Sequence, residues 1–172
     1  MSRQSGFSVL SLLLTTVALM AGLSFILSGM GPSVQGQLNA QKAAQLVAQA
    51  QLIVHRLSKC ATDHPEGDNG TALHKAYPID AHPGPLAAAA LVCPGNQRSL
   101  WSGVDGVYAP GPIAGFEPWT YSHGSPVVIS ITSAQPAADA AAVATAAQRL
   151  GLAAAATTTH APGDTLTVRV IE

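Results

Sequence analysis

The residues with the clearest chemical potential are two cysteines, Cys60 and Cys93, which stand apart in the chain and form no CxxC motif. In an exported protein a small, even number of cysteines indicates a disulfide, whereas in the cytosol the same pair more often remains as two inert buried thiols. The cysteines therefore identify no chemistry until the compartment is known. In either compartment, their wide separation favours a structural role over a reactive one.

A polar stretch around the first cysteine carries several side chains that can bind metals. Imidazole and carboxylate are natural metal ligands, but the spacing fits neither a zinc motif nor an EF-hand loop. We expect a polar surface loop and assign no metal or cofactor, and the sequence leaves open whether this loop binds a metal. The chain has no GxSxG, HExxH or P-loop motif, so we expect no enzyme. The side chains in question are His55, Asp63, His64, Glu66, Asp68, His74, Asp80 and His82.

The composition limits the class of protein. The 172 residues carry a net charge of −1, which gives no electrostatic case for binding nucleic acid. Only 10% of the residues are charged and 5% are aromatic, so the core is expected to be thin and to depend on helix packing and on any cross-link. Without the first thirty residues, about 140 remain, which is enough for one modest domain.

The first thirty residues contain a long uncharged segment. From Phe7 to Met30 there are 24 residues without a charge, enough to cross a hydrocarbon core of ~30 Å as a helix rising ~1.5 Å per residue. Arg3 precedes this segment and the next charge is Lys42, so the N-terminus is expected in the cytoplasm and the rest outside. This placement predicts that Cys60 and Cys93 form a disulfide.

Three interpretations of this segment compete. A cleaved secretory signal has a shorter apolar region, and the best cleavage match, Gly29-Met30-Gly31, is followed by Pro32, which blocks the cut. A plain single-pass anchor is physically adequate. The third interpretation depends on the residues at the start of the segment, where a short basic tip ends in Gly6 and the apolar run begins abruptly at Phe7.

This N-terminus resembles the class III signal of type IV prepilins and type II secretion pseudopilins. The resemblance implies that a prepilin peptidase in the membrane cuts between Gly6 and Phe7 and that the new N-terminal Phe7 is N-methylated. It also implies a helix that continues out of the membrane as a stalk. The implied partners are other pilin or pseudopilin subunits, the peptidase and inner-membrane lipid.

The chain departs from the family at Ser11. Most members carry a glutamate at the fifth position after the cut, where a buried carboxylate is thought to pair with the N-terminal amine of a neighbouring subunit. Ser11 cannot form this pair. The departure weakens the assignment as a major pilin and leaves a minor pilin or a pseudopilin, expected to assemble poorly alone and to enter filaments as a rare subunit.

A stalk helix is expected after the membrane segment. The stretch from Ser28 to Gln37 contains three glycines and Pro32, which fits both a flexible linker and a helix segment that unwinds on assembly. Beyond it, glutamines occupy much of one side, and the helix is predicted to end between Ser58 and Cys60. The opposite apolar side has helical spacing and consists of Leu38, Ala43, Leu46, Val47, Ala50, Ile53, Val54 and Leu57.

The remainder predicts a small α+β domain. A loop is expected from Thr62 to Gly84, the segment Pro85–Gly95 fits either helix or strand, and Leu100–Gly124 is expected to be irregular with short strand pieces. Five aromatic residues in that region, Trp101, Tyr108, Phe116, Trp119 and Tyr121, are expected to form most of the core. Strands are predicted at Pro126–Ala134 and Asp164–Glu172. The alanine-rich segment Ala137–Ala155 is predicted to form a helix, and Gly151 within it is the expected helix end.

These observations predict a leader at 1–6, a membrane and assembly helix at 7–30, a periplasmic stalk at 31–60 and an α+β domain at 61–172. The blocks CPG, GFEPW and TY between Cys60 and Tyr121 also resemble prepilin-like proteins. We expect a structural subunit of a pilus-like or type II secretion filament, held in the inner membrane with its domain in the periplasm. The alternative is a membrane-anchored periplasmic binding domain that does not polymerise, and the N-terminus of the mature protein distinguishes the two.

Overall fold

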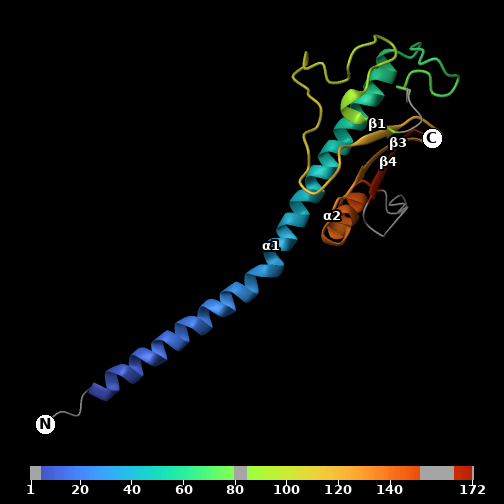
Figure 1. The fold of residues 1–172 in the computed structure, drawn as a ribbon. Coiled ribbons are helices and arrows are strands. Elements are labelled where there is room, and N and C mark those ends of the chain that lie inside the picture. Colours follow the sequence, from blue (N-terminus) through green and yellow to red (C-terminus); the bar gives the residue numbers. More distant parts are fainter. Residues whose placement is uncertain (1–4, 80–84, 152–164, 172) are drawn as a thin grey trace. The chain divides into compact units, whose positions relative to one another are not determined.

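The computed structural model has an α+β architecture with two helices and a four-stranded antiparallel sheet (Figure 1). It describes the backbone of residues 5–79, 85–151 and 165–171, and the side chains of residues 34–79, 85–151 and 165–171. The helices are α1 (Ser5–Asp63) and α2 (Pro136–Arg149). The strands are β1 (Leu86–Ala87), β2 (Thr120–Ser122), β3 (Val127–Thr132) and β4 (Thr165–Ile171), and a 3-10 turn, η1, covers Ala88–Ala90.

The chain divides into two compact units, Met1–Leu38 and Asn39–Glu172. The sheet, α2 and the last part of α1 belong to the second unit. Among the residues whose side chains are described, no helix is long and apolar enough to cross a membrane. The predicted membrane segment Phe7–Met30 lies outside these residues.

The sheet has the strand order β1-β2-β3-β4, with every neighbouring pair antiparallel. Tyr121 lies opposite Ile129, which in turn lies opposite Val168 on β4. Residues directly opposite each other share a face, so these side chains form one apolar face, and all three are buried. The other face carries hydroxyl groups that meet across the strands, as in the contact of 3.1 Å between Ser130 and Thr167.

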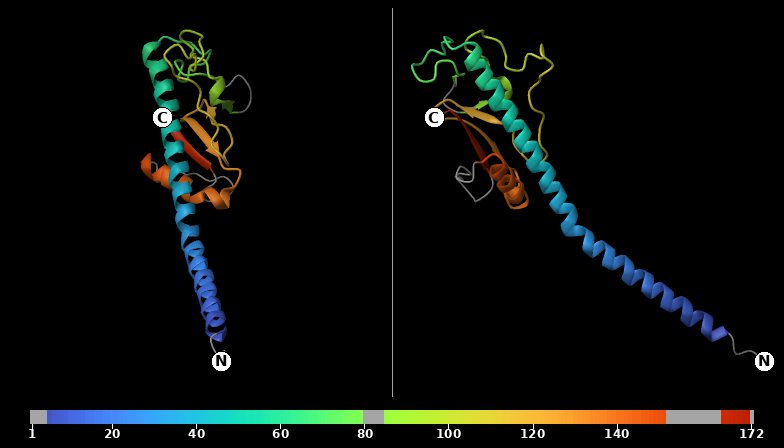
Figure 2. Two further views of the ribbon diagram at one scale, coloured as in Figure 1. Left: turned by 90° about the vertical axis from the view of Figure 1, so that its left-hand side faces the viewer. Right: turned by 180° about the vertical axis from the view of Figure 1, so that it is seen from behind.

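Residues 39–63 of α1 supply the helical side of the core. The fully or nearly buried positions recur every three or four residues and belong to the same cluster as the apolar face of the sheet. Figure 2 shows the sheet beside this part of the helix. These positions are Ala43, Leu46, Ala50, Ile53, Leu57 and Cys60.

Helix α1 ends at Asp63, a few residues beyond the predicted end between Ser58 and Cys60. Two local contacts explain the extra turn. The Lys59 ammonium lies 2.6 Å from the Asp63 carboxylate, an i,i+4 pair, and the Thr62 hydroxyl donates to the Ser58 carbonyl at 2.8 Å. The backbone N–H of His64 also donates to the Cys60 carbonyl.

The predicted strands and helix of the C-terminal part are confirmed by β3, α2 and β4. Helix α2 has Pro136 in its first turn, where proline needs no hydrogen-bond partner, and Arg149 in its last turn. Gly151 follows with φ of +72°, the left-handed conformation expected after a helix end. The ambiguous segment Pro85–Gly95 contains both a short strand, β1, and the turn η1.

The aromatic residues form a smaller share of the core than the sequence predicted. Trp101, Phe116, Trp119 and Tyr121 are buried, but Tyr108 is 70% exposed, so the prediction for Tyr108 was wrong. The rest of the core is mainly aliphatic. It comes from α1, β3, β4 and α2 and from four residues outside them, Ala88, Leu91, Leu100 and Ile113. Tyr108 stays outside because its ring lies against Gly103 in a surface loop rather than against the sheet.

Candidate functional site

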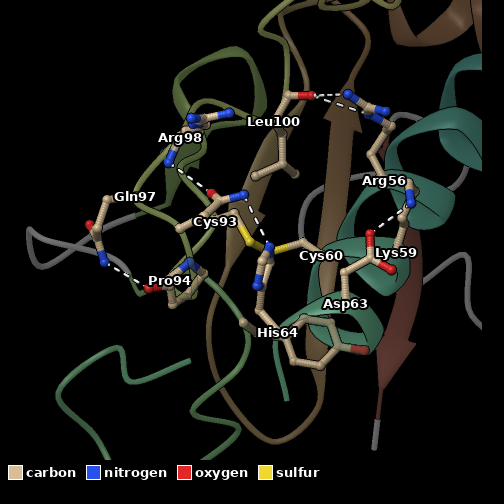
Figure 3. Close-up of a disulfide and its surroundings, with 12 residues drawn as sticks. Arg56, Lys59, Cys60, Asp63, His64, Cys93, Pro94, Gln97, Arg98 and Leu100 are labelled. Carbon is tan, nitrogen blue, oxygen red and sulfur yellow. Dashed lines mark hydrogen bonds and ion pairs between the residues drawn. A yellow bond between two sulfur atoms is a disulfide. The ribbon is translucent and has the colours of Figure 1, made fainter. Parts of the chain in front are cut away.

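The predicted disulfide joins Cys60 and Cys93, with 5.9 Å between their Cα atoms (Figure 3). Cys60 lies in the last turn of α1, and Cys93 lies in the segment that returns through an isolated bridge between Val92 and Ser99. Both cysteines are nearly buried. The disulfide therefore fastens the end of the helix to the irregular part of the compact unit, and it leaves no free thiol in the chain.

Close packing beside the disulfide depends on two glycines. A Cβ atom added at Gly95 would lie 2.0 Å from the Cβ of His64, and one added at Gly67 would lie 2.8 Å from the backbone nitrogen of Gly95. Side chains essentially never approach this closely, so the turn after α1 can contact the Pro94–Gly95 turn only because both positions lack a side chain. The ring of His64 is held on the other side by Asn96, whose amide nitrogen lies 3.1 Å from Nε2.

A groove of about 230 Å³ runs beside the disulfide and is lined mainly by polar residues. Arg56 organises one wall of this groove. Its Nη2 and Nε atoms donate to the Leu100 carbonyl at 2.7 and 3.1 Å, and its guanidinium also binds the Asp105 carboxylate. These contacts hold the loop from Ser102 to Tyr108 against α1.

The carboxylates of the groove are already matched by cations. The hydrogen bond from Arg56 lowers the pKa of Asp105 below its usual value of 3.8, and the hydrogen bond from Lys59 lowers the pKa of Asp63 in the same way. Both carboxylates are therefore ionised at neutral pH and occupied by their partners. The contacts of Arg56 with Leu100 and Asp105 hold a loop on the end of the helix.

The polar stretch that raised the question of a metal is dispersed in the structure. Among the described residues, no group of three or more His, Cys, Asp or Glu side chains is placed to hold a metal ion. His55 is exposed on α1, His64 contacts Asn96, and His74 lies edge-on to the rings of Tyr77 and His123. Asp80 and His82 lie outside the described residues.

One buried polar contact was not predicted. Asp139 in the first turn of α2 is fully buried, and its carboxylate accepts a hydrogen bond from Lys42 on α1 at 2.5 Å and another from Ser133 at 2.8 Å. Gly115, with φ of +87°, passes so close that a Cβ there would lie 3.0 Å from the Asp139 carboxylate. This cluster fastens the beginning of the α1 segment to α2.

From residue 41 to residue 51 the exposed side of α1 carries no charge, whereas Lys59 and Asp63 form an exposed ion pair near the helix end. Polar but uncharged glutamines and small alanines alternate along it from residue 41 to residue 51, opposite the buried side. Leu38 and Val34, just before this unit, are 46% and 50% exposed. The exposed uncharged positions are Gln41, Ala44, Gln45, Ala48 and Gln51.

The residues predicted to matter for processing and assembly, Gly6, Phe7 and Ser11, have no described side chains. Their roles remain predictions from the sequence. Comparisons with protein-family models, with curated proteins and with solved structures found no match to this chain.

Proposed function

We propose that the chain is a structural subunit, a minor pilin or pseudopilin, of a pilus-like or type II secretion filament. The observation that carries the proposal is the abrupt junction at Gly6-Phe7, where a basic tip meets 24 uncharged residues. In this proposal the chain is held in the inner membrane until assembly, with its N-terminus in the cytoplasm and its compact unit in the periplasm. Its action is mechanical, through contacts of the N-terminal helix with other subunits.

Two features of the compact unit support the proposal. The α1 segment uses one side for its own core and leaves an uncharged exposed side from residue 41 to residue 51, which is compatible with close packing against neighbouring subunits because no charge must be desolvated along that stretch. The segment is also fastened at both ends, by Lys42 to α2 and by Cys60 to the Cys93 loop. A helix that transmits load from a membrane segment to a domain needs such attachments.

Ser11 supports the choice of a minor subunit. Without a carboxylate at this position, the chain cannot neutralise the N-terminal amine of a neighbour inside the membrane, where an unpaired charge is costly. Its own amine retains the option of pairing with an acid from a different subunit. We therefore expect it to be a rare component of sheared filaments rather than an abundant homopolymer, and Ser11→Glu to improve self-association.

The decisive experiment is the mass of the mature N-terminus. We expect cleavage after Gly6 and a methylated Phe7 in cells that express a prepilin peptidase. Gly6→Leu should leave the precursor uncut, whereas the matched control Gly22→Leu, the same change within the apolar segment, should mature normally. An intact Met1 in the unaltered chain, or normal maturation of Gly6→Leu, would instead indicate an anchored domain that does not polymerise.

A further inference from the structure

The compact unit contains an apolar pocket that the proposed function does not use. It has a volume of about 250 Å³ and lies between Ala87–Ala89 and the loop Pro110–Trp119, with Ile113, Phe116 and Ile131 among its walls. A cavity of about 150 Å³ lined by apolar side chains is known to hold a benzene molecule. This larger pocket therefore admits one aromatic ring with a short chain attached.

The wall formed by the loop is held in place by the sheet. Phe116 forms an isolated bridge with Ser133, and the backbone N–H of Glu117 donates to the Thr132 carbonyl at 2.9 Å. Pro118 restricts the backbone of Glu117 further, because the residue before a proline favours extended conformations. A guest therefore meets a wall that is already formed, and its binding is not weakened by the cost of ordering this loop.

The neutral polar groups around the pocket already have hydrogen-bond partners. The Trp119 indole N–H donates to the Gln49 side chain at 2.9 Å, and the Gln49 amide donates to the Gly111 carbonyl at 2.9 Å. The Ala88 N–H donates to the Trp119 carbonyl at 2.8 Å, and the Ala88 carbonyl accepts from the Trp101 indole at 2.8 Å. An apolar guest therefore leaves none of these groups without a partner.

Glu117 is the one charged residue that lines the pocket. Its side chain is exposed and forms no hydrogen bond or ion pair with the residues whose side chains the structure describes. The Lys42 ammonium lies 5.9 Å from the centroid of the Phe116 ring, but it is paired with Asp139 and so leaves the Glu117 charge unmatched. An unmatched carboxylate beside an apolar pocket favours a guest with a cation at one end.

From this combination we infer that the pocket binds a small arylalkylamine, with its ring in the pocket and its ammonium donating to the Glu117 carboxylate. The ring matches the size of the pocket and its aromatic walls, Phe116 and Trp119. We assign a free small molecule rather than a protein side chain, because lysine and arginine supply the cation without the ring, and phenylalanine and tyrosine supply the ring without the cation. The inference concerns this pocket alone and does not depend on the proposed function.

The test uses the full chain in nanodiscs of zwitterionic phosphatidylcholine, which keeps detergent out of the pocket and does not attract amines as anionic lipid would. The chain is labelled with fluorotryptophan, so that each of its two tryptophans gives one fluorine NMR signal. Trp119 lines the pocket and Trp101 does not, so the Trp119 signal reports binding and the Trp101 signal serves as an internal reference. Trp101→Phe assigns the two signals.

The probes separate the contribution of the ring from that of the charge. Phenylethylamine should shift the Trp119 signal with a dissociation constant on the order of 1 mM, as expected for a fragment of this size. It should bind about fivefold more tightly than the neutral phenylethanol, which is the factor expected for an exposed ion pair. The anionic phenylacetate should bind most weakly of the three, and ethylamine, which has the cation without the ring, should leave the signal unchanged.

Two variants with matched controls locate the site. Glu117→Gln should remove the preference for phenylethylamine over phenylethanol, whereas Glu66→Gln, the same change at an exposed glutamate outside the pocket, should retain it. Gly111→Leu should abolish binding by filling the pocket from its own wall, whereas Gly36→Leu on α1 should not, and an added Cβ meets no atom within 4 Å at either glycine. The inference is overturned if phenylethylamine leaves the Trp119 signal unmoved, if Gly111→Leu still binds it, or if Glu117→Gln keeps the preference.

Discussion

The ion pair between Lys42 and Asp139 offers the most informative single perturbation. The Asp139 side chain is fully buried, whereas the Lys42 side chain is 25% exposed. Removing the lysine by Lys42→Met leaves a buried carboxylate with the Ser133 hydroxyl as its remaining described side-chain partner. Removing the carboxylate by Asp139→Asn leaves a lysine that can turn toward water.

This asymmetry sets the expected magnitudes. Breaking a buried pair by removing one partner costs about 3–5 kcal/mol, and exposed pairs contribute about 0–1 kcal/mol. Because the lysine side of this pair is reached by water, we expect Lys42→Met to lower the free energy of unfolding by about 2–3 kcal/mol. Asp139→Asn should cost about 1 kcal/mol, and the double variant little more than that, which gives a coupling energy of about 2 kcal/mol.

Urea unfolding of the full chain in detergent measures these values. Trp101 and Trp119 are the two tryptophans of the chain and both are buried in the compact unit, so their fluorescence reports on its unfolding. Lys59→Met is the matched control, because Lys59 forms an exposed pair with Asp63 and should change stability much less than Lys42→Met does. If Lys42→Met costs no more than this control, the buried carboxylate does not depend on the lysine and the reasoning fails.

Three further outcomes follow from the contacts around the disulfide. Gly95→Ala should destabilise the compact unit through the clash with His64, whereas Gly111→Ala should be nearly neutral, as a comparison of thermal midpoints will show. Removing the disulfide by replacing both cysteines with serine should cost about 3–4 kcal/mol in the loop-entropy model, and mass spectrometry that detects two free thiols in the mature chain would contradict the bond. Asp105→Asn should destabilise the loop held by Arg56 at neutral pH. Because the pKa of Asp105 is lowered in the folded chain, its contribution is present above the usual value of 3.8 and disappears as the pH falls through the lower folded value, so native and variant chains should converge in acid.

The elements that the sequence predicted well are those specified by local patterns. The alternation in β4 and the run of β-branched residues in β3 define strands without reference to the rest of the chain. Proline at the start and glycine after the end mark α2 in the same way. The disulfide could be predicted once the protein was assigned to an oxidising compartment, because the chain has two cysteines and so only one possible pair.

The contacts that the sequence did not predict depend on the tertiary arrangement. Lys42 and Asp139 are 97 residues apart, and in an alanine-rich helix an aspartate in the first turn is equally typical of an exposed position near the helix dipole. The exposure of Tyr108 depends on a loop held by Arg56, which no periodicity reveals. The small number of aromatic residues led us to predict that Tyr108 is buried, but the loop places its ring at the surface against Gly103.

The two attachments of α1 have a mechanical consequence when they are considered together. Lys42 and Cys60 are 18 residues apart on one helix, a separation of about 27 Å along its axis. The ion pair joins the near end of this segment to α2, and the disulfide joins the far end to the Cys93 loop. A pull that enters through the N-terminal helix must therefore break a buried ion pair, the apolar packing between the ends, and a covalent bond before the helix separates from its domain. Under the proposed function, these attachments let the compact unit bear a load that enters through the helix.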